Sequence, residues 1–118
     1  YVNISRENYE LVVEGMRQAV VEGTCASAAS ENYVVCGKTG TAQNNGKDHS
    51  VFMGFAPMDN PQIAIAVYVE NGGFGATYGV PIGALMMEQY LTGTLSEESE
   101  KKVEYFANRV IDYGEQTR

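Results

Sequence analysis

Three apolar runs, separated by short polar connections, occupy the middle of this 118-residue chain. The third run, QIAIAVYVEN, alternates large residues with alanines, which indicates a strand covered on both faces. The connections are too short for a parallel crossover, which needs a dozen or more residues, so neighbouring strands must be antiparallel. The sequence therefore predicts a three-stranded antiparallel meander formed by residues 33–43, 50–57 and 62–71.

A helix is predicted before the meander, over residues 6–22. Ser5 is a natural N-cap, and Gly23 is expected to end the helix in a left-handed conformation. The apolar stripe of this helix consists of Tyr9, Val12, Val13, Met16 and Val20.

Two more helices are predicted after the meander. One begins near Pro81 and ends at Gly93, with an inner face of Ile82, Leu85, Met86 and Tyr90. The other runs from Ser96 to Tyr113, with a stripe of Val103, Phe106, Ala107, Val110 and Ile111. The expected fold class is α+β, a three-stranded antiparallel meander packed with helices.

The charge balance argues against two kinds of contact. Eight basic against fifteen acidic residues give a formal net charge of −7, so we expect no nucleic-acid partner. No run of about 18 apolar residues is present, so we expect no membrane contact from this segment. No signal peptide is visible and the chain begins abruptly at Tyr1, which fits either a cytosolic protein or a piece of a longer one.

The residue types give no indication of a metal or cofactor. Cys25 and Cys36 lack a CxxC pair and nearby histidines, so they are two buried thiols or, in an oxidising compartment with suitable geometry, a disulfide. The stretch ENGGFGATYG lacks the spacing of the phosphate-binding glycine motifs, and we interpret it as a flexible loop at the edge of a cleft. His49 follows Asp48, but no spacing implies a serine or cysteine partner, so a loop histidine is expected.

The polar end of the first strand, GKTGTAQ, carries the clearest resemblance in the chain. Followed in order by HSVFMGFAP, IAIAVYVENG and PIGALMMEQYL, it resembles the C-terminal part of class B penicillin-binding proteins of the penicillin-binding protein 2 type. The preceding ISRENYELVVEGMRQAVVEGT is similar to the helix that leads into this motif in that family. The resemblance implies that residues 1–95 are the C-terminal portion of a transpeptidase domain, of the β-lactamase-like fold, and that residues 96–118 are a helical tail.

The resemblance assigns the site to Lys38, Thr39, Gly40 and Thr41. Acyl transfer from a peptide needs a group that holds the substrate carboxylate and an oxyanion hole. Lys38 supplies positive charge, and the hydroxyls of Thr39 and Thr41, on one face of the strand, can hydrogen-bond the carboxylate. Gly40 lies on the opposite face, where the missing side chain lets another element approach closely.

Catalytic roles are expected for Lys38 and Thr41, and substrate binding for all four residues. By resemblance, the backbone N–H of Thr41 is one donor of the oxyanion hole. The strand is then a sheet edge that the substrate peptide joins as an additional strand.

The family also needs an S-x-x-K motif, which holds the nucleophile, and an S-x-N motif. Ser99 with Lys102 and Ser30 with Asn32 fit these patterns by letters. The first pair lies downstream of the lysine motif on a charged helix, and the second lies only a few residues before it, so we interpret both as coincidental. The nucleophile is therefore expected outside this chain, and the isolated fragment is predicted to be inactive.

The function implied by the resemblance is a D,D-transpeptidase that cross-links peptidoglycan stem peptides through a serine acyl-enzyme, and that β-lactams acylate. The parent protein would be anchored in the inner membrane with this domain in the periplasm. The expected partners are the stem peptide, β-lactams and the missing remainder of the domain, with self-association of the fragment through its bare apolar faces. The alternatives are a serine β-lactamase, a β-lactam sensor domain, or a non-catalytic interaction domain in which the motif is coincidental.

Overall fold

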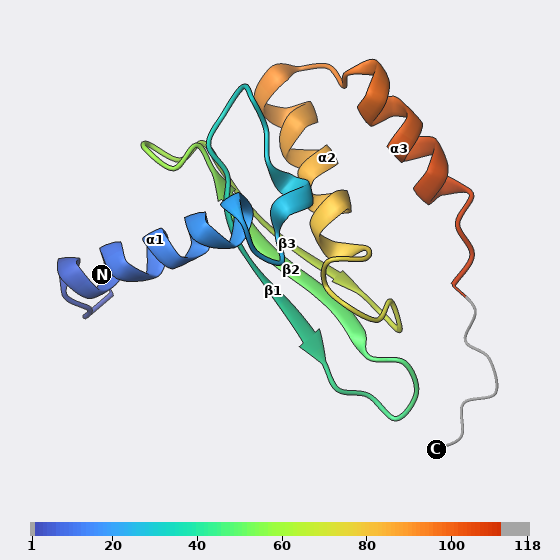
Figure 1. Ribbon diagram of the computed structural model, residues 1–118, viewed down its shortest axis with the longest axis horizontal. Coiled ribbons are helices and arrows are strands. Elements are labelled where there is room, and N and C mark those ends of the chain that lie inside the picture. Colours follow the sequence, from blue (N-terminus) through green and yellow to red (C-terminus); the bar gives the residue numbers. More distant parts are fainter. Residues whose placement is uncertain (1, 112–118) are drawn as a thin grey trace.

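The computed structural model describes residues 2–111 as a single sheet with helices around it (Figure 1). In chain order the elements are α1 (Arg6–Val21), the 3₁₀ helix η1 (Ala26–Ala28), β1 (Cys36–Ala42), β2 (His49–Ala56), β3 (Ile63–Val69), α2 (Gly79–Thr92) and α3 (Glu97–Ala107). The strand order is β1-β2-β3, and both neighbouring pairs are antiparallel. The predicted α+β meander is confirmed.

The first strand begins later than predicted, at Cys36. Cys36 lies opposite Phe55, so extending the ladder toward the N-terminus would place Val34 opposite Pro57. Proline has no backbone N–H to donate, so a regular ladder cannot continue past this point. Instead, the Met58 N–H donates a single 2.9 Å hydrogen bond to the Val34 carbonyl.

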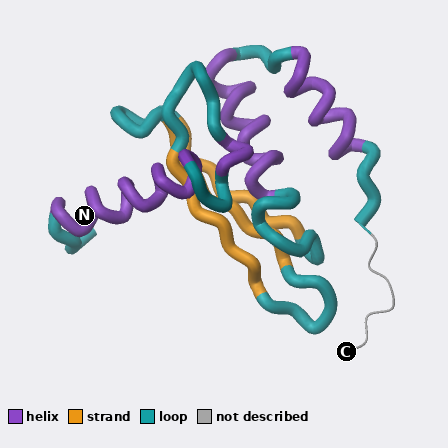
Figure 2. Tube along the Cα trace, in the orientation of Figure 1, coloured by secondary structure: helices purple, strands orange, loops and turns teal. Residues whose placement is uncertain are grey.

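One face of the sheet packs against α2 around the ring of Phe52, which is fully buried. A Cβ atom added to Gly37 or Gly54 would lie 2.6 Å from this ring, and one added to Gly83 of α2 would lie 2.5 Å from it. Real Cβ atoms do not approach this closely, so these positions accept only glycine without rearrangement. The missing side chains let α2 lie directly on the strands (Figure 2).

The predicted inner face of α2 is wrong. The buried residues of this helix are Gly79, Val80, Gly83 and Met87, whereas Met86 and Tyr90 are 54% and 64% exposed. Two of the four buried positions are glycines, which add nothing to a hydrophobic periodicity. The hydrophobic periodicity of the sequence therefore predicted a neighbouring stripe of larger residues as the buried face.

The first helix buries only its last turn. Ser5 accepts a hydrogen bond from the Asn8 N–H, as predicted for an N-cap, but Val20 is the only buried residue of α1. Gly23 does not adopt the predicted left-handed conformation; a Cβ there would lie 2.9 Å from the Cα of Ala19, so close packing explains this glycine. The first turns of α1 extend away from the strands (Figure 1).

The other face of the sheet is largely open, against the expectation that both faces are covered. Ala64 and Ala66 of β3 are exposed, as is Met53 of β2. Between α1 and this face runs an apolar groove of about 620 Å³. We call it the α1 groove, and its lining includes Tyr9, Val12, Val13, Met16, Phe55, Met58 and Ala64.

The last helix ends earlier than predicted, at Ala107, and Tyr113 lies outside the described residues. Its predicted apolar stripe is not a core face, because Val103 and Val110 are 41% and 79% exposed. The one buried residue of α3 is Ser99, near its N-terminus. Among residues 2–111, no helix is long and apolar enough to cross a membrane.

Candidate active site

The four predicted site residues lie on β1, at an edge of the described sheet (Figure 1). Within residues 2–111, β1 pairs with β2 on one side only. The register places Thr39 opposite Phe52 and Thr41 opposite Ser50. One edge of the motif therefore has no strand partner among residues 2–111, and the other edge is paired with β2.

The two threonines and the lysine of the motif lie on opposite faces of β1. Thr39 and Thr41 share the face of Phe52, and Lys38 and Gly40 occupy the other face. Lys38 is exposed, and its Nζ donates to the Thr39 carbonyl. The positive charge is thus held at the motif and open to an anionic ligand.

The hydroxyl of Thr39 has a partner that sequence reasoning missed. Its Oγ1 lies 2.9 Å from Oγ1 of Thr24, from the segment between α1 and η1. A hydroxyl offers one donor and two acceptor positions, so this contact leaves capacity for a ligand. Thr41 is exposed at the end of the strand. No local pattern links Thr24 to the motif, because the contact depends on the path of the chain.

The close approach expected at Gly40 occurs at another glycine. A Cβ on Gly40 would meet nothing nearer than the Cβ of Val51 at 3.4 Å, within the described residues. A Cβ on Gly75 would lie 2.5 Å from the Val51 carbonyl oxygen and 2.9 Å from that of Gly40. Gly75 is therefore the residue that lets the glycine-rich loop approach β1 and β2.

Buried Ser50 fixes this glycine-rich loop to the sheet. Its hydroxyl donates to the Phe74 carbonyl at 2.8 Å and accepts from the Gly79 N–H at 3.1 Å. The Gly73 N–H donates to the Asp48 carbonyl at 2.7 Å. The loop predicted to be flexible is thus tied to the sheet at three points. In the sequence, this anchor is indicated by a single serine among the inward-facing residues of an apolar strand.

The Asp48–His49 pair joins the β1–β2 hairpin to the glycine-rich loop. His49 Nδ1 accepts from the Asn71 N–H at 2.9 Å, and an Asp48 carboxylate oxygen accepts from the Asn44 N–H at 3.2 Å. The Asn44 side-chain amide donates to that of Asn71 at 2.7 Å. His49 is the first residue of β2 rather than a loop residue, and these contacts favour a structural role for both residues over a catalytic dyad.

Both cysteines are buried free thiols, and the disulfide alternative is not observed. Burial raises the pKa of the Cys25 thiol, against opposing effects of hydrogen bonds with Thr24 and Thr39 and of the Lys38 charge. Burial likewise raises the pKa of the Cys36 thiol. A raised pKa keeps a thiol protonated at neutral pH, so neither cysteine is suited to act as a nucleophile here.

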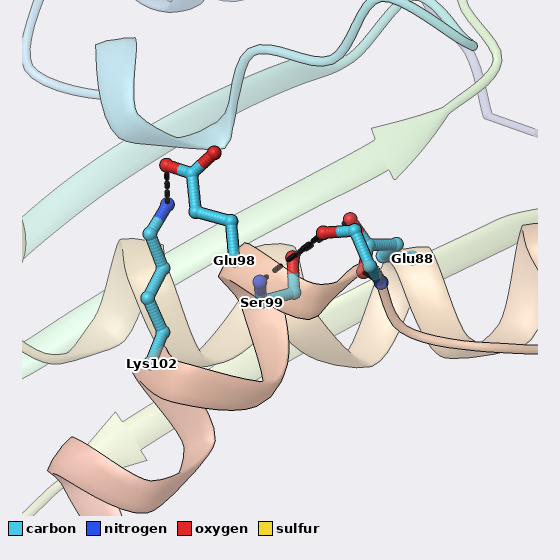
Figure 3. A network of polar contacts seen from close by, with 5 residues as sticks. Glu88, Glu98, Ser99 and Lys102 are labelled. Carbon is cyan, nitrogen blue, oxygen red and sulfur yellow. Dashed lines mark hydrogen bonds and ion pairs between the residues drawn. The ribbon is translucent and has the colours of Figure 1, made fainter.

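The two motifs that we interpret as coincidental take part in local hydrogen bonds and an ion pair. Ser99 donates its hydroxyl to a Glu88 carboxylate oxygen at 2.9 Å, and Lys102 lies 3.9 Å from Glu98 (Figure 3). Ser30 accepts from the Asn32 N–H at 3.1 Å, within a bend. Both motifs border one cavity of about 380 Å³, but residues 38–41 are not part of its lining. No cluster of three metal-ligating side chains occurs within residues 2–111.

Comparisons of this chain with known proteins all indicate the same family. Residues 2–89 match the family described as the penicillin binding protein transpeptidase domain. Peptidoglycan D,D-transpeptidase MrdA of Haemophilus influenzae is 34% identical over 108 residues, covering 75% of this chain and 17% of that protein. The chain therefore spans about one sixth of the length of this relative.

Comparison with solved structures indicates the same family. Pseudomonas aeruginosa PBP2, solved in complex with WCK 5153, matches with a TM-score of 0.68 and 39% identity over 83% of this chain and 23% of that chain. Penicillin-binding protein A of M. tuberculosis, solved as a ceftriaxone acyl-enzyme, matches with a TM-score of 0.68 and 28% identity over 75% of this chain and 22% of that one. The chain thus belongs to the penicillin-binding protein transpeptidase domain family, as a segment of such a domain.

Proposed function

We propose that this chain is the part of a peptidoglycan D,D-transpeptidase that holds the donor peptide for a serine supplied from outside these residues. The proposal depends on one observation: in a chain of this family, the polar stretch Lys38–Thr41 lies on an edge strand that has a strand partner on one side only among residues 2–111. A free edge offers backbone hydrogen bonds to an extended peptide, and the adjacent lysine and hydroxyls suit its terminal carboxylate.

In the proposed reaction, the hydroxyl of the serine attacks the carbonyl carbon of the penultimate D-alanine, and the terminal D-alanine leaves with the proton that the serine gives up. The amine of a second stem peptide then attacks the carbonyl carbon of the acyl-enzyme. The cross-linking amide bond forms, the ester bond to the serine breaks, and the serine oxygen takes up the proton that the amine loses. The hydroxyls of Thr39 and Thr41 bind the carboxylate of the donor, Lys38 supplies positive charge from the strand edge, and the Thr41 N–H stabilises the oxyanion. β-Lactams acylate the same serine, since they imitate the donor.

The remainder of the transpeptidase domain is the partner that we propose for the open face of the sheet and the α1 groove. Tyr9 and Val12 are 53% and 63% exposed there, and Met53 is 51% exposed. We propose that residues 1–95 form a portion of that domain and that the residues from 96 onward, which include α3, form a tail. We place the parent protein on the periplasmic side of the inner membrane, where its peptidoglycan substrate lies.

Labelling with fluorescent penicillin tests this function. We expect the full-length protein that contains this segment to acquire a stable covalent label, and the 118-residue chain alone to remain unlabelled. The Lys38→Ala variant of the full-length protein should be labelled more slowly, whereas Lys101→Ala, on the exposed side of α3, should match the wild type.

Other outcomes of the labelling experiment would favour other functions. An unlabelled full-length protein would favour a non-catalytic interaction domain, and a label lost by rapid hydrolysis would favour a β-lactamase. A labelled 118-residue chain would mean that the nucleophile lies within it, against our interpretation of Ser99 and Ser30.

A further inference from the structure

A cavity of about 460 Å³ lies at the C-terminal end of β1, where the candidate active site ends. One side of it is formed by Thr41, by Lys47 and Asp48 of the β1–β2 hairpin, and by the loop around Phe74. The other side is formed by residues 109–111. We call this cavity the tail pocket. Its volume is in the range of ligand-binding pockets, which is about 300–1,000 Å³.

The tail that closes this pocket lies beyond the residues that match the family, which end at residue 89. It is fixed at the start of α3 by Glu88 of α2, whose carboxylate accepts from the Ser96 N–H at 3.1 Å and from the Ser99 hydroxyl at 2.9 Å (Figure 3). Two hydrogen bonds to one carboxylate, at the positive end of a helix, set where α3 begins.

Tyr78 holds the tail at a second place, around the end of α3. Its hydroxyl accepts from Nε of Arg109 at 2.9 Å, and its ring makes an edge-to-face contact with Phe106 at 5.9 Å between centroids. Tyr78 is itself nearly buried, at 9% exposure, and directly precedes α2. The tail is thus held at two places within residues 96–111, and Arg109 lines the same cavity as Thr41.

The charges around the tail pocket suit an anion. Its charged lining groups are two cations, Lys47 and Arg109, and one carboxylate, Asp48, in a chain whose formal net charge is −7. The phenol of Tyr78 also lines the pocket and accepts from Arg109. Asp48 already accepts from the Asn44 N–H. The Arg109 guanidinium uses Nε for Tyr78, and its two terminal amino groups keep the planar geometry that pairs with a carboxylate.

We propose that the tail pocket is a second carboxylate subsite, in which Arg109 and Lys47 bind an anionic group of the peptide substrate beyond the one held by Lys38–Thr41. This inference rests on the proposed function and deepens it. The substrate class is a peptide that ends in D-alanyl-D-alanine and carries an additional free carboxylate. The tail outside the family match thereby becomes a specificity element of this protein.

Two peptides and three arginine variants of the full-length protein test the subsite. Both peptides end in D-alanyl-D-alanine; one carries an additional side-chain carboxylate, and the other carries a carboxamide at the same position. Dissociation constants are measured by fluorescence anisotropy. Arg109→Gln should weaken binding of the carboxylate peptide about tenfold, as expected for a lost charge-assisted hydrogen bond, and should leave the carboxamide peptide unchanged.

Arg109→Lys should retain part of the affinity, because it keeps the charge but loses the fork geometry. Arg6→Gln is the matched control, since Arg6 lies on α1 with a side chain 92% exposed, and it should bind both peptides like the wild type. Equal weakening of both peptides by Arg109→Gln would show that Arg109 only positions the tail, and no weakening of either would also overturn the subsite.

Penicillin labelling of the same proteins separates this inference from the proposed function. A wild-type protein that is not labelled contradicts the proposed function, whatever the peptides do. A labelled wild type that binds both peptides equally contradicts the carboxylate subsite alone.

Discussion

Thr39 is the residue of the motif whose contacts can best be separated by mutation, because its hydroxyl touches a residue outside the motif. The Thr24 hydroxyl lies 2.9 Å away, and the two positions are fifteen residues apart in the chain. Thr24 contacts the motif through this hydroxyl, whereas Thr39 is proposed to contact the substrate carboxylate directly. The two threonines should therefore differ in what they contribute to acylation.

Thr39→Val keeps the branched shape of the side chain and removes the hydroxyl. In the full-length protein we expect acylation by labelled penicillin to slow about tenfold or more, because a hydrogen bond to a charged group is worth about 1.5–3 kcal/mol. Thr24→Val should slow acylation much less. The measurement is the second-order rate of labelling. Equal losses in the two variants would contradict a separate substrate contact for Thr39.

The positions of Lys38–Thr41 could be predicted because a strand pattern and a local motif coincide there. Thr24 and Ser50 could not, because their hydrogen bonds connect residues distant in sequence. A hydroxyl in a sequence does not reveal its partner until the fold brings the two together. The roles assigned to the four motif residues stay predictions.

At the scale of elements, the helix–sheet contact between α2 and β2 depends on glycine. The strands were predictable from their period of two and their short connections, and β1 is shorter than predicted because Pro57 cannot donate to the ladder. The buried face of α2 could not be predicted in this way, since Gly79 and Gly83 carry no apolar side chain. Hydrophobic periodicity identifies a helix, but it misplaces the face when the contact is made by the absence of side chains.

Gly83→Ala tests this contact, with Gly15→Ala as its control. Both glycines lie inside helices, but a Cβ at Gly83 would be 2.5 Å from the Phe52 ring and one at Gly15 would have nothing within 4 Å. Replacing glycine by alanine inside a helix raises the free energy of unfolding by about 0.5–1 kcal/mol, and this gain applies to both variants. The difference between the two variants therefore isolates the strain at Gly83.

We expect the free energy of unfolding of Gly83→Ala to be lower than that of Gly15→Ala by about 1–3 kcal/mol. Thermal unfolding of the two full-length variants, followed by calorimetry, measures it. Indistinguishable unfolding midpoints would mean that α2 moves away from the sheet without cost, and that the contact with Phe52 is not tight.

At the scale of the whole molecule, this chain buries one face of its sheet and leaves the other open. The α1 groove and the exposed alanines of β3 form an apolar surface that the proposed remainder of the domain would cover. An uncovered apolar surface of this kind promotes association between copies. We therefore expect the 118-residue chain by itself to self-associate through the α1 groove.

Val12→Glu should reduce this self-association, because it places a charge inside the groove. Leu11→Glu is the control, since Leu11 is 71% exposed and is not part of the groove lining. Sedimentation velocity of the isolated chain over a range of concentrations measures the effect. A wild-type chain that stays monomeric throughout, or two variants that behave alike, would contradict association through this groove.

Ser50 links three parts of the molecule through one hydroxyl, since it bonds the loop at Phe74 and the start of α2 at Gly79 from within β2. A ligand that pulled this loop outward would have to break the anchor of the helix as well. Outward movement of the loop is therefore coupled to the start of α2. A ligand at the tail pocket would thus contact a loop whose position is set by a hydroxyl buried in β2.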